Sequence, residues 1–265
     1  MTDNVHIGTS GWSYDDWVGP FYPAGAPKRE FLSHYATQFD VVEVDSTYYA
    51  IPARRMVQGW AERTPKGFRF ALKAPQEITH KRVLVDCQEG MERFLGALEP
   101  LGEKTVCVLL QFGYFNRATF RSAKPFFERL NGFLREYVDR VPLAVEIRNK
   151  NWLTDAYFDL LRSHKVAAAL VEHAWLPPIN HVVEQHDVVT GPFSYVRLIG
   201  DRKGIEEITR TWDKVVMDRS ADLRRVARAI RQIAQRVPVH TFVNNHYAGH
   251  GPETSRQLRA ACEDV

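Results

Sequence analysis

Polar or charged residues end eight short apolar runs along this 265-residue chain. Acids such as Glu43 and Glu146 can exchange protons, and bases such as Lys73 and Arg197 can hold an anion. Gathered in one place, residues of these types would form a site for acid–base chemistry on a charged ligand. The eight run ends are Gly8-Thr9-Ser10, Glu43-Val44-Asp45, Lys73, Gln111, Glu146-Ile147-Arg148, Glu172, Arg197 and Asn244-Asn245-His246.

The apolar runs themselves are predicted to be strands, because they are short and rich in Val, Ile, Leu and Phe. Amphipathic helical patterns separate them; Val226, Ile230 and Ile233, for example, share one helix face within 218–236. Alternating strands and helices predict a parallel sheet, and eight units predict its closure. The fold class is therefore α/β, a (β/α)8 TIM-like barrel with long loops at the carboxyl ends of the strands and a single domain over residues 1–265. The predicted strands are 5–9, 41–46, 68–73, 106–112, 143–147, 167–171, 195–199 and 239–244.

Side-chain alternation decides which residues of each strand point into the barrel. In the second strand the valines would face the helices, which turns Glu43 and Asp45 inward, and the same count turns Glu146 and Arg148 inward in the fifth strand. Barrel sites lie at the carboxyl ends of the strands, so we expect one polar site there. The alternative is a closed salt-bridge network that only fixes barrel geometry. Three further strands contribute Lys73, Gln111 and Arg197 by the same count.

Six ordered motifs, spread over nearly the whole chain, resemble the YecE-like family of uncharacterised proteins, a domain of unknown function. The resemblance implies a TIM-barrel fold and names no activity. Asp45 stands where members usually carry Asn, which adds a carboxylate. Asn149 stands where a His often follows the arginine of the fifth strand. Gly113-Tyr114 replaces a usual pair of prolines. The motifs are Ile7-Gly8-Thr9-Ser10-Gly11-Trp12, Val42-Glu43-Val44-Asp45-Ser46-Thr47-Tyr48-Tyr49, Phe70-Ala71-Leu72-Lys73-Ala74-Pro75 with Ile78-Thr79-His80, Ala144-Val145-Glu146-Ile147-Arg148 with Trp152, Tyr195-Val196-Arg197-Leu198, and Asn244-Asn245-His246.

Function is predicted from this rim. We expect Glu43 and Glu146 to be the catalytic, proton-handling residues acting on a small phosphorylated or carboxylated metabolite. The glycines of 200–204 and 249–252 favour an anionic group beside the last two strands, although they also suit a plain turn and helix start. Aromatic residues at the rim would either stack a planar ligand or seal the barrel end. The predicted ligand-binding residues are Trp12, Asp45, Tyr48, Lys73, Gln111, Arg148, Trp152, Arg197, Asn244 and His246.

Two other functions remain open. One is a metal-dependent phosphodiester hydrolase or nucleic-acid-binding barrel, and the other is a non-catalytic binding or scaffold protein. The metal alternative would use residues such as Glu172 and His173, but no His-x-His or His-Glu-x-x-His spacing supports it, so no metal and no cofactor is predicted. Glu172 and His246 are also candidates for acid–base work.

The composition limits the partners. A net charge of +3 gives no global reason to expect nucleic acid or a membrane surface, and the arginines of 224–236 fit an ordinary solvated helix face. Three cysteines without a Cys-x-x-Cys pattern fit reduced thiols. The first four residues lack the character of a signal peptide, and no apolar run is long enough to span a membrane. We therefore expect a cytoplasmic protein with a small anionic partner.

Overall fold

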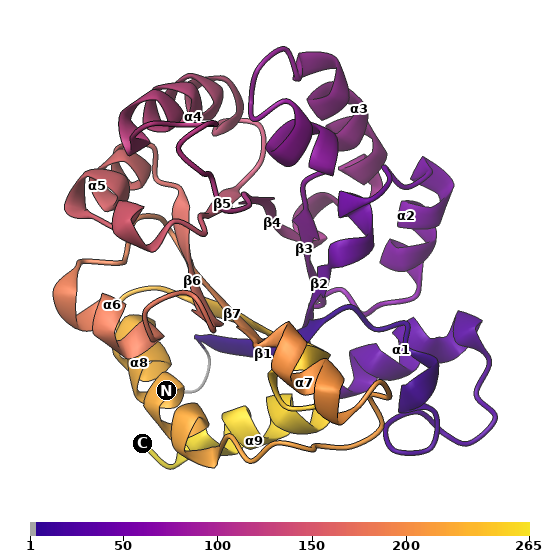
Figure 1. The fold of residues 1–265 in the computed structure, drawn as a ribbon. Helices are drawn as coiled ribbons and strands as arrows, with labels where there is room; N and C mark the ends of the chain where they lie inside the picture. Colours follow the sequence, from indigo (N-terminus) through magenta and orange to yellow (C-terminus); the bar gives the residue numbers. More distant parts are fainter. Residues whose placement is uncertain (1–3) are drawn as a thin grey trace.

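The described residues, 4–265, form a closed barrel of eight parallel strands in this computed structural model (Figure 1). Each strand pairs with the next, and β8 pairs with β1 to close the ring. All eight predicted strands are confirmed; the predicted absence of a leader falls partly on residues 1–3, which lie outside the described residues. The strands are β1 (Val5–Ser10), β2 (Val41–Val44), β3 (Arg69–Lys73), β4 (Thr105–Gln111), β5 (Leu143–Glu146), β6 (Ala167–His173), β7 (Ser194–Gly200) and β8 (Val239–Val243).

Helices surround the strands as an outer ring (Figure 1). The predicted amphipathic helix before the last strand is α8, and it buries Val226, Ile230 and Ile233 as expected. Among the described residues, no helix combines the length and the apolar character that a membrane span requires. The cytoplasmic location stays a prediction. The helices are α1 (Lys28–Gln38), α2 (Arg54–Glu62), α3 (Gln88–Leu98), α4 (Ala123–Tyr137), α5 (Asp155–Ser163), α6 (Ile179–Gln185), α7 (Arg202–Ile208), α8 (Ser220–Ala234) and α9 (Gly251–Glu263).

The barrel interior combines small and aromatic side chains. Ala71, Ala144 and Ala169 leave room that Tyr195 and Phe242 fill, with their ring centroids 4.9 Å apart. Large groups opposite small ones let the inward side chains pack without voids. This buried layer lies directly beneath the polar side chains of the rim.

The aromatic loop after β1 is packed rather than open. Trp17 and Tyr22 are buried, and the ring of Tyr22 stacks on Phe31 of α1 with the centroids 4.1 Å apart. The indole nitrogen of Trp17 donates to Asn245 at 3.3 Å, which ties the loop to the end of β8. Of the two predicted uses of these rings, sealing the barrel end is the one that these contacts fulfil.

Candidate functional site

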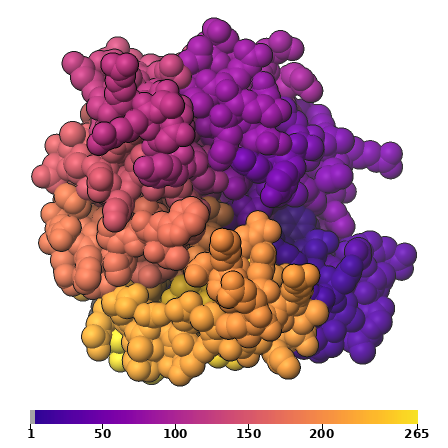
Figure 2. Space-filling model, viewed as in Figure 1, coloured from indigo at the N-terminus to yellow at the C-terminus, as the bar shows by residue number. Residues whose placement is uncertain are grey.

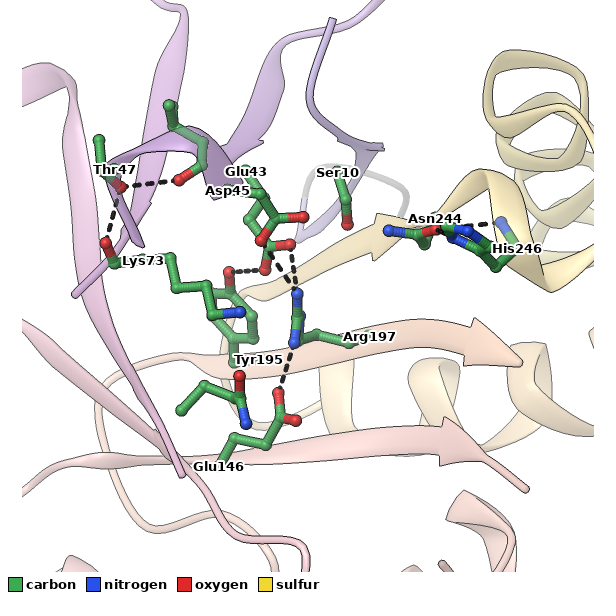
Figure 3. A network of polar contacts seen from close by, with 12 residues as sticks. Ser10, Glu43, Asp45, Thr47, Lys73, Glu146, Tyr195, Arg197, Asn244 and His246 are labelled. Atoms are coloured by element: carbon green, nitrogen blue, oxygen red, sulfur yellow. Dashed lines mark hydrogen bonds and ion pairs between the residues drawn. The ribbon is translucent and has the colours of Figure 1, made fainter. Parts of the chain in front are cut away.

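Three strands bring oppositely charged side chains together at the centre of the barrel mouth (Figure 3). Arg197 of β7 donates from Nη2 to Glu43 of β2 and from Nη1 to Glu146 of β5, both at 2.7 Å. All three side chains are almost fully buried, with at most 3% of their surface exposed. The inward alternation predicted from the sequence is thus correct for these residues, although they lie far apart along the chain.

The two buried glutamates are held in the ionised form. Burial acts to raise the pKa of Glu43, but the charge and hydrogen bond of Arg197 outweigh it, and the Tyr195 hydroxyl adds a hydrogen bond of 2.5 Å. Burial likewise opposes ionisation of Glu146, but Arg148 and Arg197 lower its pKa to about 2. Carboxylates fixed in this way hold the arginines in place and are poor proton donors at neutral pH.

Asp45 differs from both glutamates. It begins the short 3-10 turn η2 (Asp45–Tyr48) directly after β2, and 29% of its side-chain surface remains exposed. The hydrogen bond that Arg197 Nη2 donates to it is long at 3.3 Å. Burial and the charge of Glu43 raise the pKa of Asp45 to about 6. Asp45 is therefore the carboxyl group of the mouth best matched to proton exchange near neutral pH.

Lys73 brings a cation to the same centre, close to the acids Asp45, Glu146 and Glu43. Its Nζ lies 4.2 Å from the centroid of the Tyr48 ring, and Figure 3 shows the ammonium pointing toward the Glu43–Arg197 pair. The ammonium of Lys73 forms no ion pair and no hydrogen bond with any of residues 4–265. Burial and the charge of Arg197 lower the pKa of Lys73. Tyr48, predicted as a ligand residue, thus lies in place to support the ammonium.

Arg148 and Gln111 complete the predicted inward set. Arg148 Nε donates to Glu146 at 2.5 Å, and within the described chain its two Nη groups have no hydrogen-bond partner. Gln111 is buried beside Glu146 in the strand register and donates its amide to the carbonyl of Phe112 at 2.6 Å. Arg148 therefore has donors to spare for a ligand.

Two predicted ligand residues lie elsewhere, which corrects the prediction for both. Trp12 packs edge-on against Trp60 of α2 with the centroids 5.5 Å apart, and Trp152 stacks on Phe126 of α4 at 5.6 Å. A large indole gains more from such packing than from a wet rim. Both rings belong to the layer between barrel and helices.

Asn244 and His246 form a pair of their own, away from the Glu43–Arg197 centre (Figure 3). The His246 ring contacts Asn244 Oδ1 at 2.6 Å through Nδ1 and Glu206 of α7 at 3.3 Å through Nε2. At the predicted anion site beside the last two strands, the polar side chains are likewise already engaged within the protein. Asp201 and His250 already cap α7 and α9 with their own side chains, so the glycines there serve turns and helix starts.

Glu172 points out of the barrel and is not an acid–base candidate of the mouth. Its two oxygens accept from the backbone of Ile179 at 2.8 Å and from Arg225 of α8 at 3.3 Å. Counting by two from the inward Ala167 gives Val171, so the alternation itself signals that Glu172 faces the helices. Arg225 on α8 and Arg236 just after its end are also paired with acids, which fits the predicted solvated face.

Three further residues lie at the mouth: sequence reasoning gave no role there to Tyr195 and His80, and considered His173 only as a metal ligand. Tyr195 supports Glu43, His80 packs edge-on against Tyr48 with the centroids 5.0 Å apart, and His173 ends β6. Burial and the charge of Arg148 lower the pKa of His173 to about 4, so it is neutral at pH 7. Inward alternation signals Tyr195 and His173, but His80 lies on a π-helical turn that has no sequence signature. Within residues 4–265, no group of three or more His, Cys, Asp or Glu side chains is arranged to hold a metal ion.

Comparison with known proteins shows the family to which this chain belongs. Residues 6–264 match the family described as "Protein of unknown function DUF72". The chain is 30% identical over 161 residues to the UPF0759 protein YunF of Bacillus subtilis, and 33% identical over 100 residues to the UPF0759 protein YecE of Escherichia coli. The YunF alignment covers 58% of this chain and 54% of YunF; the YecE alignment covers 38% of this chain and 34% of YecE.

Solved structures give the same fold over the whole chain. A DUF72 family protein from Thermotoga maritima is 25% identical with a TM-score of 0.76, and 98% of each chain is covered. A D-psicose 3-epimerase from Clostridium cellulolyticum, solved with D-tagatose, is 11% identical with a TM-score of 0.56, covering 98% of this chain and 97% of its own, and shares the fold alone. The family match over nearly the whole chain agrees with the resemblance inferred from the six motifs. The chain belongs to the DUF72 family.

Proposed function

We propose that the mouth of the barrel binds a small phosphorylated or carboxylated metabolite and acts on it by general acid–base chemistry. The observation that carries the proposal is the partly buried Lys73 ammonium, which lies near Asp45, Glu146 and Glu43 yet forms no ion pair and no hydrogen bond with any of residues 4–265. An unpaired ammonium in such surroundings is costly, and a ligand anion would relieve that cost.

The cations divide by role. Arg197 is already engaged by Glu43 and Glu146, so it orients these acids rather than the ligand. Lys73 and the free Nη groups of Arg148 supply the donors for the anion. Sequence reasoning gave the anion contact to Lys73, Arg148 and Arg197 together; this assignment keeps Lys73 and Arg148 and leaves Arg197 out.

Proton transfer is assigned to Asp45 in place of Glu43 and Glu146. Its pKa of about 6 leaves the carboxylate mostly ionised at pH 7 yet basic enough to accept a proton and return it. Lys73 lies near Asp45 and would stabilise negative charge that develops on the substrate. A scaffold protein needs neither a titrating acid nor an unpaired cation at its mouth.

Binding tests the first half of the proposal. We expect methyl phosphate or acetate to raise the melting temperature, because a ligand at about 100 times its Kd adds roughly 2.7 kcal/mol to the free energy of unfolding. Lys73→Met and Arg148→Met should each weaken binding at least tenfold, whereas Lys28→Met, at an exposed lysine, should bind as the wild type does. Absence of stabilisation by any anion, or unchanged binding in both variants, overturns the proposal.

Proton exchange tests the second half. Phosphorylated and carboxylated hydroxycarbonyl compounds that bind are incubated with the protein in D2O, and deuterium incorporation at carbon is followed by NMR. We expect exchange with the wild-type protein, a loss of at least a hundredfold in Asp45→Asn, and wild-type exchange in Lys28→Met. Equal exchange rates in the wild type and Asp45→Asn would refute the role of Asp45.

A further inference from the structure

A cavity of about 670 Å³ adjoins the mouth at Arg148. It lies among the loops that follow β4, β5 and β6, and its other polar or aromatic lining residues are Tyr114, Lys150 and Trp175. Figure 2 shows the segments that carry these residues, in magenta and orange, meeting on one face of the molecule. Arg148 belongs to both spaces, since its Nε donates to Glu146 at 2.5 Å.

The two aromatic side chains of the cavity are open to solvent, and hydrogen bonds anchor the backbone that carries them. Tyr114 is 68% exposed and Trp175 is 72% exposed, unlike the packed rings of the first loop. Asn149 fixes the neighbour of Tyr114 by two bonds to the Phe115 backbone, at 2.8 and 2.9 Å. The backbone of Trp175 donates to His173 Nδ1 at 3.2 Å. An aromatic side chain has few torsions, so little conformational entropy is lost when a planar group stacks on it.

The lining also indicates what kind of group would occupy the cavity. Its charged residues, Arg148 and Lys150, are both cations, and within the described chain it is lined by no carboxylate and no side-chain amide. A sugar ring with several hydroxyl groups would find few acceptors here. A flat ring that carries negative charge would find two aromatic faces and two cations.

We propose that this cavity holds an aromatic or heteroaromatic ring of the ligand whose anionic group binds at Lys73 and Arg148. The inference rests on the proposed function and narrows its substrate class to ring-bearing phosphates or carboxylates. Trp175 and Tyr114 stack the ring, and Lys150 faces its outer edge or a second anionic substituent.

Calorimetric titration with phenyl phosphate, cyclohexyl phosphate and methyl phosphate tests the inference. The wild-type protein should bind phenyl phosphate at least tenfold more tightly than methyl phosphate, with cyclohexyl phosphate in between. In Trp175→Ala the ratio of the affinities for phenyl and methyl phosphate should fall to one-sixth of its wild-type value or less. In Trp175→Phe this ratio should stay within threefold of the wild-type value, because a flat ring remains. Met56→Ala is the control, since Met56 is 54% exposed on α2 and does not line the cavity.

The outcomes separate the two proposals. Equal affinity for the phenyl and methyl compounds, with Lys73→Met still weakening both, overturns the ring inference and leaves the anion site standing. An unchanged preference in Trp175→Ala also overturns the ring inference. Absence of binding by all three phosphates overturns the proposed function and this inference with it.

Discussion

At the residue scale, the mouth divides three similar carboxyl groups into two kinds. Glu43 and Glu146 are buried against Arg197 and stay ionised, whereas Asp45 has a weak bond and a like charge beside it. Alternation along β2 and β5 predicted which side chains enter the mouth. It could not predict their partners, because the choice of Arg197 over Lys73 depends on three-dimensional reach across the barrel.

Asp45 is predicted to make stability fall as pH rises. Its folded-state pKa of about 6 lies above the ordinary value of 3.8, so its contribution is fully present below pH 3.8 and is lost as pH rises through 6. Asp45→Asn removes this titration. Its free energy of unfolding, measured against that of the wild type, should therefore increase by about 2 kcal/mol from pH 4.5 to pH 8. Urea unfolding of both proteins at the two pH values measures the gain. A constant difference between them would show that Asp45 titrates normally.

At the scale of elements, the strands were predictable because two signals agree along each of them, an apolar run and a polar residue at its end. The rim was less predictable, since tertiary packing decides the conformation of its loops and the position of each ring. Trp152 and Trp175 illustrate the limit: one stacks on Phe126 and the other is 72% exposed. Residue type alone does not separate the two positions.

The end of α5 offers a test of local backbone strain. Lys165 has a φ of 55° in a Schellman turn, in which its N–H donates to Arg162 and that of Val166 donates to Leu161, both at 3.0 Å. Glycine adopts this conformation without strain, so Lys165→Gly should raise the free energy of unfolding by about 1 kcal/mol. Lys165→Ala keeps the strain and should show no gain. Chemical denaturation compares the variants, and equal stability of Gly and Ala at this position contradicts the prediction.

At the scale of the whole molecule, barrel closure depends on close contacts at β1. Gly8 lies so near β2 that an added Cβ would sit 2.0 Å from the carbonyl oxygen of Val41. Its own carbonyl accepts from Ser255 of α9 at 3.1 Å, which links the last helix to the first strand. The polar mouth is rigid because the eight strands beneath it form one closed ring.

Gly8→Ala should therefore destabilise the entire barrel by about 3 kcal/mol or more, because strand backbones would have to move apart. Gly132→Ala is the control, since Gly132 is exposed on α4 with open space around it. The free energy of unfolding of that variant should rise by about 0.5 to 1 kcal/mol, because alanine has a higher helix propensity than glycine. Thermal and urea unfolding measure both changes, and a mild effect of Gly8→Ala would mean that the closure is looser than these contacts imply.

The mouth holds two glutamates that stay ionised at neutral pH and one carboxyl group, that of Asp45, with a pKa of about 6. A carbon-13 NMR titration of the side-chain carboxyl groups tests this most directly, with signals assigned by their loss in Asp45→Asn and Glu146→Gln. We predict a midpoint near pH 6 for Asp45 and ionisation of Glu146 down to about pH 2. A midpoint near 4 for Asp45, or protonation of Glu146 above pH 4.5, would contradict the account.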